Sequence, residues 1–100
     1  MITHVASFRW KPETTAEQIR RIQDSLESLP ALIPEIVTYR CGPDVGAHGA
    51  ANMDFAIVAT FASVDGWRIY DAHPEHDRVR GEIIRPWIGE RAAVQFECMG

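Results

Sequence analysis

The sequence has little of what builds a disulfide framework or a zinc module, because it holds only two cysteines in 100 residues. Cys41 and Cys98 form no CxxC pair, and each ends a stretch with the pattern of a strand. We therefore interpret both as reduced thiols that pack as small apolar side chains. A disulfide scaffold, a zinc ribbon and a cysteine nucleophile are not expected.

Positive charge and long apolar runs are also scarce. The net charge is −4, and the basic residues form no stripe with interleaved aromatics that could neutralise phosphates. The apolar runs, such as residues 55–58, are only strand-sized, and the first residues lack the basic segment and apolar core of a signal peptide. We expect a cytoplasmic protein that binds neither nucleic acid nor membrane.

The remaining composition is that of an ordinary globular protein, with 46% apolar and 24% charged residues. No repeat, low-complexity tract or linker interrupts the chain. We therefore expect residues 1–100 to form a single domain with one core.

Four stretches have the alternation or the β-branched and aromatic content of strands: residues 2–10, 35–41, 53–61 and 92–98. In the first stretch, His4 falls on the same face as four apolar side chains. That face should meet the helices.

Helical periodicity fills the intervals between these strands. A capping-box pattern at residues 14–18 opens an amphipathic helix that should end by Pro30. A second helix is expected over residues 63–72, and a further helical piece over residues 74–87.

The order strand, helix, strand, strand, helix, strand predicts an α+β fold of the ferredoxin-like βαββαβ type. Such a fold has a four-stranded antiparallel sheet with both helices on one face. The other face stays uncovered, and we expect Val5, Ala56, Val58 and Ala93 on it. An apolar face of this kind predicts a homodimer that forms through the sheet faces.

Polar side chains gather in residues 70–76, where Pro74 ends one helix and starts the next. His76 is a candidate general base, because imidazole titrates near neutral pH. Tyr70 is placed to donate a hydrogen bond to a carbonyl oxygen or a developing oxyanion. The alternative is structural: His73 and His76 then satisfy backbone groups at the junction, and the tyrosine is part of the core.

A strand histidine directed at the same space would complete a polar pocket. His4 points toward the helices and needs a buried partner. A metal site formed by His4, His73 and His76 is the rival interpretation, but Pro74 disturbs the helical register of the last two, and no metal is expected. Acidic residues at helix ends, Asp71 among them, are most simply solvated charges.

Four features of the sequence carry a family resemblance: the pattern of residues 4–11, the amphipathic helix, residues 55–61 with the helix after them, and the Tyr-x-x-His-Pro-x-His element at 70–76. Together they resemble the stress-responsive dimeric α/β-barrel (Dabb) family. The resemblance covers essentially the whole chain. It implies a homodimer whose two sheets close into a barrel, with a small-molecule cavity between each sheet and its own helices.

The resemblance also implies roles for single residues. A plant polyketide cyclase of this family uses a Tyr/His pair at positions that match Tyr70 and His76, which implies His76 as general base and Tyr70 as its orienting or oxyanion partner. Its histidine on the first strand matches His4, whereas its pocket histidine on the third strand corresponds to Phe55 here. That difference changes the polarity of the cavity and argues against a polyketide of the same chain length.

The leading hypothesis is a small-molecule-binding dimeric barrel with cofactor-independent cyclase or lyase chemistry on a polyketide-like or phenolic substrate. His76 and Tyr70 would be catalytic. The residues expected to bind substrate are His4, Phe8, Phe55, His73 and Trp87. The alternatives are a non-catalytic stress-response dimer and a cofactor-free monooxygenase. Whether the Gly/Ala-rich loop at 46–51 covers the pocket is left open.

Overall fold

The computed structural model describes residues 1–99 and alternates strands with helices in the predicted order. The strands are β1 (Ile2–Trp10), β2 (Ile36–Pro43), β3 (Phe55–Phe61) and β4 (Ile88–Glu97). The α-helices are α1 (Ala16–Glu27), α2 (Leu29–Leu32), α3 (Val64–Ala72) and α4 (Pro74–Arg78). Short segments of other helical types are η1 (Gly49–Ala51), η2 (Val79–Ile84) and η3 (Arg85–Trp87). Within residues 1–99, none of these helices is both long and apolar enough to cross a membrane.

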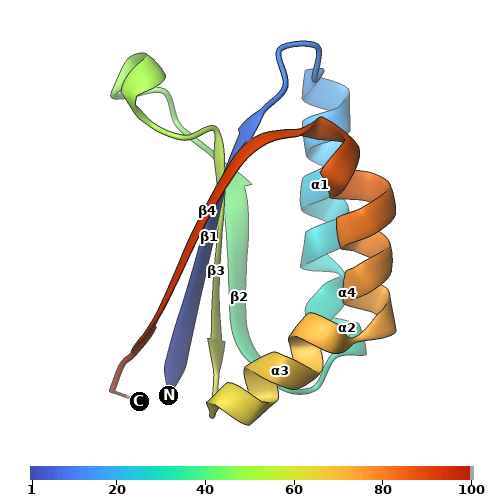
Figure 1. The fold of residues 1–100 in the computed structure, drawn as a ribbon, viewed down its shortest axis with the longest axis vertical. Helices are drawn as coiled ribbons and strands as arrows, with labels where there is room; N and C mark the ends of the chain where they lie inside the picture. The colour runs from blue at the N-terminus through green and yellow to red at the C-terminus, as the bar shows by residue number, and fades with distance from the viewer. Residues whose placement is uncertain (100) are drawn as a thin grey trace.

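The four strands form one antiparallel sheet in the order β2-β3-β1-β4. All α-helices lie on one side of this sheet, and the other side is bare (Figure 1). The two ends of the chain lie side by side, where the Cys98 N–H donates to the Met1 carbonyl at 2.9 Å. The predicted ferredoxin-like α+β fold is confirmed.

The predicted capping box forms at the start of α1. Thr15 Oγ1 accepts a hydrogen bond from the Gln18 N–H at 3.2 Å, and the Gln18 side chain accepts one from the Thr15 N–H at 2.9 Å. The helix ends at Glu27, and Pro30 lies in the first turn of the short α2. Proline is tolerated there because a first-turn N–H has no partner within the helix.

The predicted helical piece over 74–87 is divided into three segments. Between α4 and the 3₁₀ turn η3, the segment η2 is a π-helix, and the Arg85 N–H donates to the carbonyl of Arg80. Because a π-helix joins residues five apart, Arg80 and Arg85 lie closer to one face than they would in an α-helix. The spacing of the buried Val79, Ile83 and Ile84 fits either helix type, so the sequence could not show this widening.

The core lies between the helices and the inner face of the sheet. The predicted inward set of β1 is confirmed, because Ala6, Phe8 and Trp10 are buried. Strands β2 and β3 add Ile36, Phe55, Ile57 and Phe61. The helices and the residue after α2 contribute Ile22, Leu26, Leu29, Ile33, Tyr70, Val79, Ile83 and Ile84.

The prediction of which face Ala93 occupies is wrong. Ala93 pairs with Ala6 on the helix side, whereas Val94 pairs with Val5 on the bare side. All residues of β4 after Ile88 are exposed, so burial does not force its apolar residues inward. Val58, Val94 and Phe96 are 39%, 58% and 50% exposed, which makes the bare face more apolar than expected.

The loop of residues 44–53 connects β2 to β3. It turns at Gly46 and Gly49, which have φ of 82° and 61°, a region that favours glycine. Together with Ser7 and Ala56 of the bare face, the loop borders an open hollow of about 500 Å³. The loop therefore lies on the side of the sheet away from the helices (Figure 1) and does not cover the helix-side space.

Candidate functional site

A partly enclosed cavity of about 170 Å³ lies between the inner face of the sheet and the helices. It brings together four of the predicted site residues, His4, Phe8, Tyr70 and His76. The rest of its lining is formed by Ala6, Leu26, Ile57, Trp67, Asp71, Arg80, Ile84, Arg85, Ile88 and Arg91.

His76 sits just after the helix junction with one ring nitrogen engaged. Its Nδ1 lies 3.1 Å from the carbonyl oxygen of Asp71. A carbonyl oxygen only accepts, so Nδ1 must carry the proton and Nε2 the lone pair. Burial lowers the pKa of His76, an effect opposed by this hydrogen bond. A neutral imidazole with a free Nε2 has the form that a general base requires.

Two tyrosine hydroxyls meet beside this imidazole. The His76 ring stacks on Tyr70 with ring centroids 4.2 Å apart, and the Tyr70 hydroxyl lies 2.9 Å from that of Tyr39. Burial raises the pKa of both tyrosines, so both keep their protons at neutral pH. One of the two hydroxyls donates its proton to the other in this hydrogen bond. When Tyr39 is the donor, the Tyr70 proton is free for a ligand oxygen.

His4 enters the cavity from β1. Its Nδ1 lies 3.0 Å from the side-chain amide nitrogen of Gln95, directly opposite on β4. An amide nitrogen only donates, so Nδ1 accepts and Nε2 carries the proton. Burial and the nearby charge of Arg91 lower the pKa of His4. His4 is therefore a neutral hydrogen-bond donor, complementary to His76.

Asp71 is part of a charged cluster rather than a solvated helix end. Arg80 contacts the Asp71 carboxylate at 3.1 Å and its carbonyl at 3.2 Å, and also pairs with Asp77. The carbonyl of Asp71 thus receives hydrogen bonds from both Arg80 and His76. This cluster holds the end of α3 against α4 and η2 and fixes the orientation of the His76 ring.

Three predicted ligand-binding residues are not part of the cavity lining. His73 caps α4, because its Nδ1 accepts a hydrogen bond from the Glu75 N–H at 3.1 Å. Phe55 packs against the rings of Phe8 and Trp10 in the core. Trp87 is half-buried in η3 outside the lining. Across residues 1–99, no three histidine, cysteine or acidic side chains gather in a way that could hold a metal ion.

Sequence reasoning missed several residues of the site. Tyr39 had a usable signal, since it alternates with Cys41 on a β-branched strand and both side chains face inward. Arg91 pairs with Phe8 and therefore lies on the helix side of the sheet. The sequence pattern predicted the opposite side for its neighbour two positions on, Ala93. The cavity position of Arg85 depends on the π-helix, for which the sequence carries no signal.

Comparison with known proteins identifies the family. No curated protein matches this chain. A dimeric ferredoxin-like protein of unknown function from Thermobifida fusca YX is 42% identical, with a TM-score of 0.88 over 97% of this chain and 90% of that one. A dimeric protein of unknown function from Bacteroides fragilis is 24% identical, with a TM-score of 0.85 over 97% and 95% of the two chains.

A hydroxynitrile lyase from Passiflora edulis is similar in fold, with 21% identity and a TM-score of 0.83 over 95% of this chain and 90% of that one. This likeness shows the fold alone. The family model described as Stress responsive A/B Barrel Domain (Dabb) matches residues 2–98. The chain therefore belongs to the stress-responsive A/B barrel (Dabb) family.

Proposed function

We propose that this protein binds a small carbonyl or phenolic compound and transforms it by acid–base chemistry without a cofactor. The observation that carries the proposal is the hydrogen bond from His76 Nδ1 to the Asp71 carbonyl. It leaves the lone pair of Nε2 unused by any described residue, in a cavity that also holds the Tyr70 and His4 donors.

The proposed step is proton abstraction next to a carbonyl group. His76 Nε2 accepts the proton, and the electron pair left behind moves onto the carbonyl oxygen. The Tyr70 hydroxyl, supported by Tyr39, donates a hydrogen bond to that oxygen as its negative charge develops. The proton then returns from His76 to the product, so that no redox partner is required.

The size of the cavity favours a compact substrate. A cavity of about 150 Å³ holds one benzene ring, and the cavity here is about 170 Å³. Its walls are largely apolar, with Phe8, Leu26 and Ile57 among them. A single ring fits this space better than an extended polyketide, so we favour proton transfer on a monocyclic compound over the cyclisation of a long chain.

We also propose that the protein is a homodimer. The Thermobifida fusca and Bacteroides fragilis relatives are described as dimeric. On this chain, Val58, Val94 and Phe96 form an exposed apolar area on the bare sheet face. Burying that area against a second copy would remove it from water.

Replacing His76 tests the catalytic role. H76Q should lower turnover of a monocyclic carbonyl substrate by about 10²–10⁴-fold, because glutamine has no basic nitrogen. The control is H48Q in the loop on the other side of the sheet, which should retain full activity. Turnover by H76Q at the wild-type rate would rule out His76 as the base.

A second candidate function is ligand binding without turnover. It is favoured by the contacts of His76 with Tyr70 and the Asp71 carbonyl, which also hold the helix junction together. In that case H76Q would lower the free energy of unfolding by about 1–3 kcal/mol while ligand affinity changed little. Chemical denaturation and ligand titration of the same variant separate the two functions.

A further inference from the structure

Charge is unevenly distributed around the cavity. Arg80, Arg85 and Arg91 line it together with one aspartate, Asp71. Three arginines against one aspartate leave a net charge of +2 when both histidines are neutral, although the whole chain carries −4. A positive cavity in an acidic protein attracts small anions.

Two of these arginines are free to bind a ligand. Arg80 is engaged by Asp71 and Asp77. Arg85 and Arg91 form neither an ion pair nor a side-chain hydrogen bond with any residue in 1–99, and both are exposed. A guanidinium group presents several N–H donors in a plane, which matches the two oxygens of a carboxylate.

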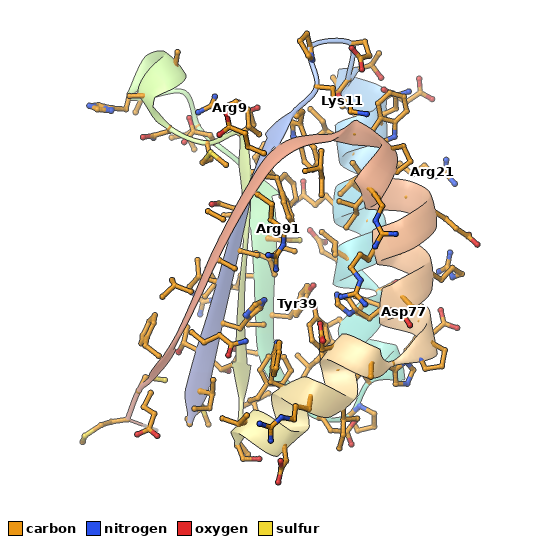
Figure 2. The ribbon with its side chains drawn as sticks, in the orientation of Figure 1. Arg9, Lys11, Arg21, Tyr39, Asp77 and Arg91 are labelled. Carbon is orange, nitrogen blue, oxygen red and sulfur yellow. The ribbon has the colours of Figure 1, made fainter. Side chains whose placement is uncertain are left out.

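Two separate elements direct these side chains to the same cavity. Arg91 lies opposite Phe8 on the inner face of β4, and Figure 2 shows it in the space between the sheet and the helices. Arg85 follows the π-helix η2, which turns it toward the cavity with Arg80. The charge of Arg91 is close enough to His4 to lower the pKa of that imidazole, so an anion bound at Arg91 would lie near His4.

We infer that Arg85 and Arg91 bind the anionic group of the ligand, and that this ligand is a monocyclic carboxylate whose ring occupies the apolar part of the cavity. The inference rests on the proposed small-molecule function and adds to it the charge and class of the compound. The ring would contact the apolar lining of the cavity, and its carboxylate would lie at the exposed Arg85 and Arg91.

Calorimetric titration of the full chain with benzoate and benzamide tests this inference, because the two compounds share a ring and differ in charge. Wild-type protein should bind benzoate at least about tenfold more tightly than benzamide, as expected for a hydrogen bond to a charged group. R91Q and R85Q should each remove most of this preference. R21Q is the matched control, since Arg21 is exposed on α1, on the far side of the helices from the sheet (Figure 2).

The outcomes separate this inference from the function on which it rests. Equal affinity of wild-type protein for benzoate and benzamide would overturn the anion site and leave the small-molecule cavity standing. Absence of binding by either compound would overturn both. Inorganic phosphate that bound more tightly than benzoate would also overturn the inference, because the site would then serve a free anion and not a ring carboxylate.

Discussion

At the scale of single residues, the two cavity histidines differ in the nitrogen that remains available to a ligand. The Asp71 carbonyl leaves His76 with a free lone pair, and the Gln95 amide leaves His4 with a free N–H. Burial lowers the pKa of each ring from its ordinary value of 6.5, so both rings are neutral at pH 7. The cavity therefore holds a base and a hydrogen-bond donor in the same pH range.

The lowered pKa of His76 makes stability depend on pH. Below the ordinary value of 6.5, the unfolded chain binds a proton that the folded protein binds only at lower pH. The free energy of unfolding should therefore be highest above about pH 6.5 and fall as the pH drops through the window between that value and the lowered pKa. Urea denaturation between about pH 5 and 8 measures this slope.

H76Q provides the comparison for that slope. Without the imidazole, the unfolding free energy should decrease less between about pH 6.5 and 5 than it does in the wild type. His4, whose pKa is also lowered, should account for part of the decrease that remains. A variant whose slope equals that of the wild type would show that His76 titrates normally in the folded protein.

The Tyr39 and Tyr70 hydroxyls form a coupled pair. Y39F should cost about 1–2 kcal/mol of unfolding free energy, because the buried Tyr70 hydroxyl loses its partner. Removing both hydroxyls in Y39F/Y70F should cost less than the sum of the two single variants. Denaturant titration of the four proteins gives the coupling, and strict additivity would mean that the two hydroxyls do not interact.

Much of the candidate site could be predicted from residue types. The spacing of Tyr70 and His76 at a proline junction and the inward side of His4 were visible in the sequence, and the cavity contains all three. Tyr39 and Gln95 were missed because their importance comes from contacts between residues far apart in the chain. The His4–Gln95 pair depends on the register of β1 against β4, and the Tyr39–Tyr70 pair on the packing of α3 against β2, and neither can be predicted from local sequence patterns.

At the scale of elements, local sequence patterns predicted the structure correctly where a side chain caps the end of its own helix. The Thr15 capping box formed as predicted because both of its hydrogen bonds are local. They failed for residues 74–87, where the π-helix η2 replaces a continuous α-helix. They also failed to predict which side chains of β4 face the helices, because all residues of this edge strand after Ile88 are exposed.

Loss of the α1 cap should be measurable. T15A removes the acceptor of the Gln18 N–H and should lower the free energy of unfolding by about 1 kcal/mol. T14A is the control, because Thr14 lies outside the capping box. Equal effects of the two substitutions in thermal or urea denaturation would show that the cap contributes nothing specific.

At the scale of the whole molecule, the order of strands and helices was sufficient to predict the ferredoxin-like fold, because few topologies accommodate that order with right-handed connections. The bare sheet face follows from the same topology, since both helical crossovers lie on one side (Figure 1). The assembly of two such faces is part of the proposed function.

A charge on the bare face should prevent dimer formation. V58E places a carboxylate in the centre of the sheet, where a second copy would have to bury it without a partner. Sedimentation equilibrium should then show a monomer. I69E is the control, because Ile69 is also exposed and apolar, at 50%, but lies on α3 on the helix side. A V58E protein that remained dimeric would exclude this face as the interface.

The central claim is that His76 is a neutral imidazole with a free Nε2 that faces a ligand. Nitrogen NMR of the His76 ring tests it directly, through a pH titration with and without benzaldehyde. We predict a proton on Nδ1, a pKa below 6.5 and a change in that pKa when the compound binds. A proton on Nε2, or an ordinary titration that the compound does not alter, would contradict the account and favour a structural role for His76.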